Sequence, residues 1–182
     1  VYLFDSRVHA AVRALAPSPR GELEITDAIQ RLVDLDEPVR VHHVTGWWKD
    51  TGHKEDLLEA NRLVLETITP RIDGFVDDAT TIDGAVVVEP GARVTASVLR
   101  GPLIVGADVV VDDSEIGPYT SIGARCRVAA SVVENSVVME ECDISGVRRL
   151  LDSLLGRGVV VEGARGDRPV RLMVGDHGYV SC

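Results

Sequence analysis

Residues 98–128 read VLRGPLIVGADVVVDDSEIGPYTSIGARCRV, and an aliphatic side chain recurs in them at every sixth position. These positions are Val98, Ile104, Val110, Ile116, Ile122 and Val128. A six-residue period is typical of a parallel β-helix, in which each repeat supplies a short strand and a turn. Because one coil cannot bury its own aliphatic face, we expect successive triangular coils to stack and to build the core together.

The same period extends in both directions from this stretch. The further positions are Ile82, Val88 and Val94 before it, and Val132, Val138, Ile144, Leu150, Leu154 and Val160 after it. The spacing shortens to four residues within the similar local sequences VTASV, VAASV and LLDSL. We therefore interpret the shortened repeats as corners that successive coils share. A β-sandwich is the alternative, but its strands would show a period of two.

Residues 1–69 have a different texture, with predicted strands and helices mixed. The segments VYLF (1–4) and VRVHHV (39–44) predict strands. Apolar residues at helical spacing predict helices within 5–15, 24–35 and 51–68. Asp5 or Ser6 is the expected N-cap of the first helix and Thr26 that of the second. The predicted division is an α/β region at 1–69, a β-helix at 70–166 and a C-terminal tail at 167–182.

Composition limits the classes of partner and of cellular location. The net charge of −10 argues against nucleic acid, whose phosphates require a basic surface. No apolar run approaches the roughly 20 residues of a membrane-spanning helix, so we expect no membrane partner. The cysteines Cys126, Cys142 and Cys182 show no CxxC spacing, which favours free thiols in a reducing cytoplasm. We expect Cys126 and Cys142 to be small buried or corner residues.

The histidines bear on whether the β-helix is catalytic. They are His9, His42, His43, His53 and His177, so none falls between residues 54 and 176. Many β-helices with six-residue repeats belong to acyltransferases, which need a base, commonly His, to activate the acceptor. We therefore expect this β-helix to be structural, packing subunits together or shielding the first domain, and an acetyltransferase activity in it is disfavoured.

Several motifs point to a family. They are PSPRGELEITDAI (17–29) and VHHVTGWWKDTGHKEDLLEANRLV (41–64), supported by VYLFD (1–5) and GDHGYV (175–180). Together they resemble the sugar-1-phosphate nucleotidyltransferases, and among these the C-terminal half of the long-form glucose-1-phosphate thymidylyltransferases. The resemblance covers essentially the whole chain. It implies part of a Rossmann-like nucleotidyltransferase domain followed by a left-handed parallel β-helix.

The resemblance also implies a reaction. In the family, an oxygen of a sugar 1-phosphate attacks the α-phosphorus of a nucleoside triphosphate, and pyrophosphate leaves. For the thymidylyltransferases the substrates are dTTP and glucose 1-phosphate and the product is dTDP-glucose, with UTP left open as the nucleotide here. Catalysis of this kind is mainly positioning and neutralisation of charge.

The family motifs select four site residues in this sequence. Asp50, in WWKDTG, matches one of the two aspartates that hold Mg²⁺, and it is the predicted catalytic and metal-binding residue; its alternative role is to cap a turn. Arg20 matches the arginine that contacts the sugar phosphate, and its alternative is a solvated loop charge. Trp48 is expected to wall the site and Tyr2 to line the sugar pocket, and for both the alternative is core packing.

Other parts of the family's machinery are missing from the sequence. There is no glycine-rich GxGTRL loop to hold the triphosphate, no first metal aspartate and no Glu-Lys segment. We therefore expect this chain to be half of a longer enzyme and inactive alone. The alternative is an assembly module without catalysis. Under both hypotheses we expect a homo-oligomer formed through the β-helix.

Overall fold

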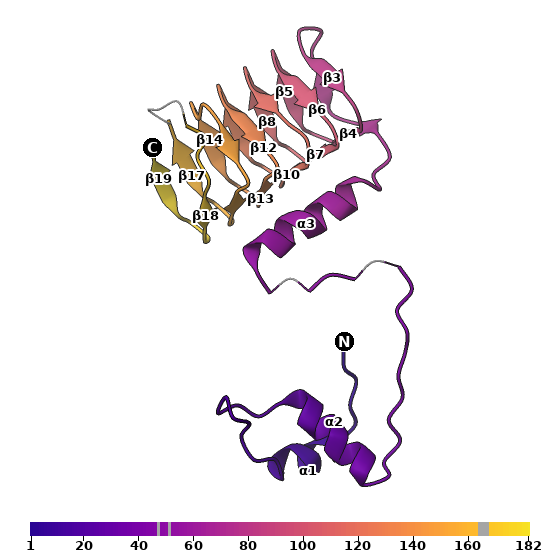
Figure 1. Cartoon of the computed structure of the whole chain (residues 1–182). Helices are drawn as coiled ribbons and strands as arrows, with labels where there is room; N and C mark the ends of the chain where they lie inside the picture. Colours follow the sequence, from indigo (N-terminus) through magenta and orange to yellow (C-terminus); the bar gives the residue numbers. More distant parts are fainter. Residues whose placement is uncertain (47, 51, 164–167) are drawn as a thin grey trace. The chain divides into compact units, whose positions relative to one another are not determined.

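The computed structural model describes residues 1–46, 48–50, 52–163 and 168–182. The chain divides into two compact units, Val1–Trp48 and Lys49–Cys182. The first contains helices α1 and α2, and the second contains helix α3 and all the named strands (Figure 1). In these described ranges, no helix has the length and apolar character that a bilayer crossing requires.

The first unit is a pair of packed helices, α1 (Arg7–Arg13) and α2 (Ile25–Asp34). Ala11 and Ala28 are each at most 1% exposed, because these small side chains let two helix backbones approach closely. The N-cap of α1 is Ser6, as expected, while the Asp5 carboxylate accepts the Arg7 N–H at 3.0 Å. The predicted cap of α2 is wrong, since α2 begins just after Glu24 and not after Thr26.

The two strands predicted in this unit do not form. Residues 1–4 and 39–44 have no strand structure, and Leu3 and Val41 are 95% and 81% exposed. A strand needs a neighbour to accept and donate its backbone hydrogen bonds. Neither segment pairs with another in the described part of this unit, so the apolar run at 1–4 and the alternation at 39–44 have no sheet to enter.

The second unit is a parallel β-helix, as predicted (Figure 1). Its strands form three parallel sheets in the described part of the chain, called here faces 1, 2 and 3. Face 1 contains β1 (Arg71–Ile72), β4 (Val86–Val88), β7 (Leu103–Val105), β10 (Thr120–Ile122), β13 (Val137–Val138), β16 (Leu154–Leu155) and β18 (Met173–Val174). Face 2 contains β2 (Phe75–Val76), β5 (Arg93–Thr95), β8 (Val110–Asp112), β11 (Arg127–Ala129), β14 (Asp143–Ser145), β17 (Val160–Glu162) and β19 (Tyr179–Ser181). Face 3 contains β3 (Thr81–Asp83), β6 (Val98–Arg100), β9 (Glu115–Ile116), β12 (Val132–Glu134) and β15 (Leu150–Leu151).

The inward residues form a continuous core, with some positions shifted by one residue from the prediction. Val88 pairs in register with Val105, and Leu99 pairs with Ile116, so these coils are 17 residues long. The predicted inward positions Val98, Ile104, Val110, Val132, Leu154 and Val160 are wrong, because the buried residues are their neighbours Leu99, Leu103, Val105, Val111, Val133, Leu155 and Val161. Ile82 is 41% exposed because β3 is the last strand of face 3.

Tight corners explain the shortened repeats. Ala96 and Ala130, in the similar sequences VTASV and VAASV, have φ values of +46° and +45°, and Asp152 in LLDSL has +50°. This left-handed backbone conformation turns the chain sharply. At these corners, successive inward-facing aliphatic residues are five positions apart and not six, as Val94 and Leu99 are.

Buried serines stabilise one of these corners from coil to coil. The Ser97 hydroxyl accepts the Ser114 N–H at 3.1 Å, and the Ser114 hydroxyl accepts the Ser131 N–H at 3.2 Å. The Ser131 hydroxyl then accepts the Val147 N–H at 2.9 Å. A buried hydroxyl is tolerated when it is hydrogen-bonded, so this ladder satisfies backbone donors that the corners leave unpaired.

Two cysteines lie in the core, as predicted. Cys126 and Cys142 are each 2% exposed, and the Cys142 N–H donates to Cys126 Sγ at 3.3 Å. The hydrogen bond with the Cys142 side chain, together with burial, raises the pKa of the Cys126 thiol. A thiol of this kind stays protonated and is a poor nucleophile.

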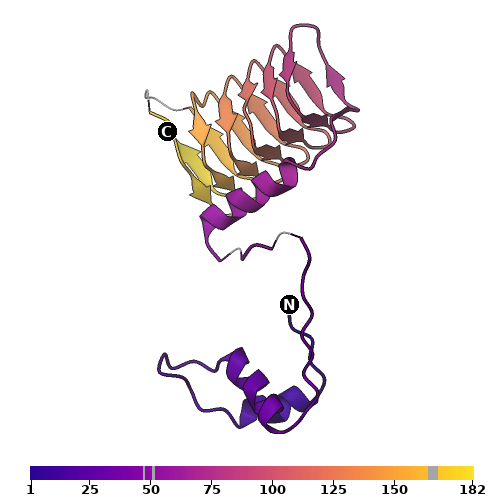
Figure 2. The same ribbon diagram turned by 45° about the vertical axis from the view of Figure 1, so that its right-hand side comes forward.

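Face 1 differs from the other faces because most of its outward residues are also apolar. The outward residues at matching positions in successive coils are Val87, Ile104, Ser121, Val137, Leu154 and Met173. Val87 is only 7% exposed although its neighbours Val86 and Val88 point inward. Helix α3 (Lys54–Leu65) runs beside the stacked coils, as Figures 1 and 2 both show.

The position of α3 bears on the predicted division at residue 70. The compact unit that contains the β-helix begins at Lys49, because α3 is hydrogen-bonded to face 1. The assignment of residues 1–69 to a catalytic domain rests on the sequence resemblance, and it stays a prediction. In the structure, the segment that begins at Lys49 belongs to the same compact unit as the β-helix.

A glycine at one corner provides a test of the coil spacing. A Cβ added at Gly123 would lie 2.8 Å from the Glu140 nitrogen in the next coil, whereas one added at Gly175 meets nothing within 4 Å. We expect Gly123→Ala to lower the free energy of unfolding by about 1–3 kcal/mol because the coils must move apart. Urea unfolding followed by circular dichroism measures this, with Gly175→Ala as the control. Equal midpoints for the two variants would contradict the close approach.

Candidate functional site

Asp50 lies in an exposed segment without regular secondary structure at the start of the second unit. Its side chain is solvent-exposed, and it makes no hydrogen bond or ion pair with any residue that the structure describes. The alternative role, capping a turn, would require its carboxylate to accept a backbone N–H, and no such bond occurs in the described ranges. The carboxylate is therefore available to a ligand.

Residues on either side of Asp50 contact helix α3. Lys49 Nζ lies 2.5 Å from Glu59 Oε2 and 3.0 Å from Asp56 Oδ1, and both acids are on α3. The His53 N–H donates to Asp56 Oδ2 at 3.0 Å, which caps the helix. Lys49 first, and then this N–H, hold the pKa of Asp56 below its ordinary value. Asp56 thus connects the residue before Asp50 to the first turn of α3.

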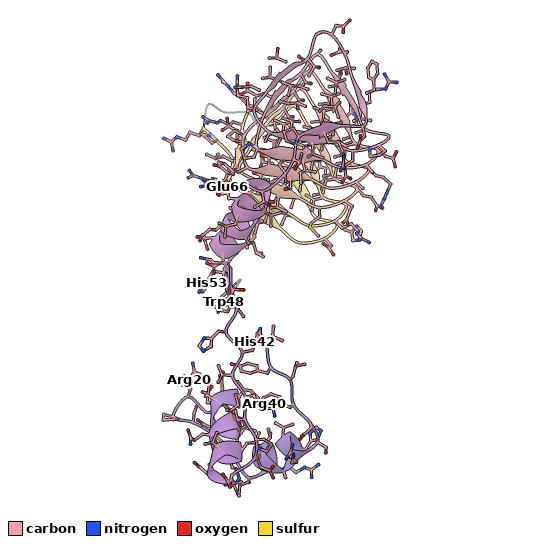
Figure 3. All side chains as sticks on the ribbon, turned by 90° about the vertical axis from the view of Figure 1, so that its right-hand side faces the viewer. Arg20, Arg40, His42, Trp48, His53 and Glu66 are labelled. Atoms are coloured by element: carbon pink, nitrogen blue, oxygen red, sulfur yellow. The ribbon has the colours of Figure 1, made fainter. Side chains whose placement is uncertain are left out.

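Arg20 lies in the first unit, in the loop between α1 and α2, and is labelled in Figure 3. Its side chain is 72% exposed. Its Nε and one terminal nitrogen donate to Glu24 Oε1 at 3.1 and 2.7 Å. Ser18 Oγ donates to the same oxygen at 3.0 Å. The guanidinium is therefore already oriented by a carboxylate, and an exposed pair of this kind is weak enough to be exchanged for another anion.

The two aromatic candidates are both exposed, which bears on their alternative role. Trp48 is 70% exposed and Tyr2 is 58% exposed. Tyr2 stacks on Phe4 with ring centroids 5.9 Å apart. Neither side chain is therefore packed in the core of the first unit. Trp47, the other tryptophan of the WWKD sequence, lies outside the described residues.

The candidate residues are divided between the two compact units. Tyr2, Arg20 and Trp48 belong to the first unit and Asp50 to the second. Tyr2 lines a cavity of about 190 Å³ that Arg20 does not border. No group of three or more His, Cys, Asp or Glu side chains suited to a metal ion occurs in the described part of the chain.

Sequence reasoning missed the contacts between the Asp50 segment and α3, since no role was assigned to Lys49, Asp56 or Glu59. A signal was present for Asp56, because acidic residues are enriched in the first turn of a helix. His53 and Glu66, labelled in Figure 3, flank α3 at its two ends. Through Asp56 and Glu59, the helix holds Lys49, the residue that precedes the candidate metal residue.

Comparisons with known proteins agree with the motifs. Residues 1–67 match the sequence model of the nucleotidyl transferase family. The chain is 49% identical to a glucose-1-phosphate thymidylyltransferase of Streptomyces antibioticus over 99% of its own length and 51% of that protein. It is 50% identical to the Streptomyces griseus enzyme of the same name, over 97% of this chain and 50% of that protein. A low-salt glycan biosynthesis nucleotidyltransferase of Haloferax volcanii is 42% identical over 97% of this chain and 51% of its own length.

The extent of these matches matters as much as the identity. The chain spans about half the length of the curated relatives it matches. Both the α-helical first unit and the β-helix lie within the matched residues. The predicted resemblance is thereby confirmed for the whole chain.

Proposed function

The chain is a relative of the sugar-1-phosphate nucleotidyltransferases, similar to glucose-1-phosphate thymidylyltransferases along nearly its whole length, and on this premise we propose that it forms part of an enzyme that joins dTTP to glucose 1-phosphate. The products are dTDP-glucose and pyrophosphate. One observation carries the proposal: the carboxylate of Asp50, which is exposed and has no partner among the residues that the structure describes, stands in the motif that the family uses for a metal ion.

Asp50 fits a magnesium ligand. Mg²⁺ is held in proteins by one or two carboxylates, together with substrate phosphates and several waters. A single exposed carboxylate with no partner among the described residues suits that arrangement, while a closed cage of protein ligands would not. The ion, when bound, neutralises charge on the phosphate oxygens. The contribution of this chain is to hold the carboxylate at a fixed position beside α3.

Arg20 supplies the second role. A guanidinium binds carboxylate and phosphate with the same planar pair of donors. Two of these nitrogens donate to Glu24 Oε1 in the structure, and we propose that a phosphate oxygen of the sugar substrate takes the place of this carboxylate oxygen. In the proposal, the exposed Tyr2 ring lines the sugar pocket, and the exposed Trp48 ring forms a wall of the site near the metal ion.

The triphosphate needs donors that this chain does not contain. The family's glycine-rich GxGTRL loop is absent from the 182 residues. We propose that another polypeptide segment provides it, that the 182-residue chain alone is inactive, and that the complete enzyme works in the cytoplasm.

A pyrophosphate-release assay tests the function. We expect release from dTTP and glucose 1-phosphate, with Mg²⁺ present, by the protein that contains this chain together with the glycine-rich segment. We expect none by the 182-residue chain alone. Replacing dTTP by UTP, and glucose 1-phosphate by other sugar phosphates, reports the substrate preference. Turnover by the isolated chain at the rate of the complete protein would overturn the proposed division of labour.

A homo-oligomer formed through the β-helix remains part of the proposal. The observation that favours it is that Met173, the outward residue of the last strand of face 1, is 58% exposed. A second copy would remove that surface from water. An assembly module without catalysis would share this property, but its function would not depend on Asp50.

A further inference from the structure

Helix α3 is fixed to face 1 of the β-helix through an asparagine that uses both ends of its amide. Asn61 Nδ2 donates to the Tyr119 carbonyl at 3.0 Å. The Ser121 hydroxyl donates to Asn61 Oδ1 at 2.6 Å. The two bonds together set the direction of the amide, since only its nitrogen can donate and only its oxygen can accept here. Asn61 is therefore held at a defined place on the β-helix.

The next residue adds a second attachment at the corner of the same face. Arg62 Nε donates to Asn135 Oδ1 at 2.7 Å. The Arg62 guanidinium also lies over the Tyr119 ring, with its carbon 5.0 Å from the ring centroid. A guanidinium over an aromatic face is attracted by the ring's negative face. Arg62 thus contacts two successive coils at once.

The corner that receives Arg62 is itself connected across coils. Tyr119, Asn135 and Asp152 have φ values of +60°, +44° and +50°. Asn135 Nδ2 donates to Asp152 Oδ1 at 2.6 Å, and Arg171 Nε donates to Asp152 Oδ2 at 3.0 Å. The surface that α3 meets is therefore a preformed polar ladder that continues into the last coils.

These attachments are concentrated toward the C-terminal half of α3. Between the earlier turns of the helix and face 1 lies a groove of about 490 Å³, lined by Leu58, Arg62, Leu154 and Met173 among others. Leu65, near the end of the helix, is 1% exposed. Because the N-terminal turns border an open groove, the bonds of Asn61 and Arg62 decide the angle at which α3 leaves the β-helix.

We infer that Asn61 and Arg62 are positioning residues for Asp50, and that the β-helix is the platform that fixes the candidate metal carboxylate. The connection is continuous: face 1 holds Asn61 and Arg62, α3 carries Asp56 and Glu59, and those two acids hold Lys49 beside Asp50. The inference rests on the proposed function. A displacement of about 1 Å at a reacting group can lower a rate about a hundredfold, so an orientation error in α3 is sufficient to affect catalysis.

The test is a double variant, Asn61→Leu with Arg62→Ala, which removes the polar attachments and leaves the acids of α3 in place. In the complete protein we expect kcat to fall at least about tenfold and the Mg²⁺ concentration for half-maximal activity to rise, because the carboxylate is no longer held in place. Arg62→Lys in an otherwise unchanged chain should retain most activity, since a cation remains over Tyr119. The matched control is Arg93→Ala, which also removes an arginine from over an aromatic ring. The Arg93 guanidinium carbon lies 4.6 Å from the centroid of the Phe75 ring. Both residues lie on strands of face 2, whereas α3 is hydrogen-bonded to face 1.

A second readout separates the inference from the function. Hydrogen exchange of residues 54–65 in the 182-residue chain should become at least about tenfold faster in the double variant and stay unchanged in Arg93→Ala. Faster exchange with unaltered kcat and Mg²⁺ dependence would overturn the positioning role and leave the proposed function intact. Unchanged exchange would overturn the attachment itself. Absence of nucleotidyl transfer by the unsubstituted complete protein would instead overturn the proposed function, and the catalytic inference with it.

Discussion

Replacement of Asp50 by asparagine is expected to lower the kcat of nucleotidyl transfer by about 10²–10³-fold, since a metal ligand contributes several kcal/mol of charge stabilisation. Asparagine preserves the size and exposure of the side chain, so the fold should not change. Its neutral amide oxygen is a weaker ligand for a hard cation than a carboxylate. The measurement is steady-state pyrophosphate release by the complete protein over a range of Mg²⁺ concentrations.

The control for this prediction is a second exposed aspartate that has no place in the site. Asp83, on β3, is solvent-exposed, and Asp83→Asn should leave kcat unchanged. Arg20→Ala offers a contrast, because losing a phosphate contact should raise KM for the sugar phosphate. Equal activity of Asp50→Asn and Asp83→Asn would remove the catalytic assignment and favour the assembly module.

The six-residue period predicted the β-helix because stacked coils impose it on the sequence. It misplaced Ile104 and Leu154 because face 1 carries apolar residues on both sides. On faces 2 and 3 it misplaced Val98, Val110, Val132 and Val160, because each is followed directly by a second aliphatic residue, which is the buried one. The triplets VVV (86–88) and LIV (103–105) are buried runs in which the central residue points outward. A strand covered on both faces reads as a continuous apolar run. Those triplets were the available signal that something packs outside face 1.

The first unit shows the opposite error. Residues 1–4 form an apolar run and residues 39–44 alternate, and both patterns predict strands, yet strand formation depends on a pairing neighbour that these described residues do not supply. Local sequence records the preference for a strand but not the presence of its partner. The exposure of Leu3 and Val41 follows from the same cause.

The site was only partly predictable for a related reason. Asp50 could be proposed from the sequence because its motif is local. The attachment of α3 to the β-helix could not be predicted, because the hydrogen bond from Ser121 to Asn61 joins residues 60 positions apart, and both look like ordinary surface residues. Contacts between distant polar side chains leave no periodic signal, and they depend on the corner geometry that places Tyr119 and Asn135 under α3.

Truncation of one inward side chain should have the largest effect on stability, and it also connects the β-helix with the site. Ile144 is 0% exposed and lies in register between Val128 and Val161 of the neighbouring coils. Ile144→Ala should lower the free energy of unfolding by about 2–5 kcal/mol, because it leaves a cavity within the stacked core. Urea unfolding followed by the β-sheet circular dichroism signal provides the measurement.

The adjacent outward residue is the matched control for that substitution. Asp143 forms only an exposed ion pair with Arg127, 3.4 Å apart, so Asp143→Asn should change the free energy of unfolding by less than about 1 kcal/mol. Similar effects of the two substitutions would contradict the inward assignment of Ile144. Because α3 is anchored to face 1, Ile144→Ala should also make the activity of the complete protein fall at a lower urea concentration, in step with loss of the β-helix. Activity that outlasts the β-helix signal would show that Asp50 is held by something else.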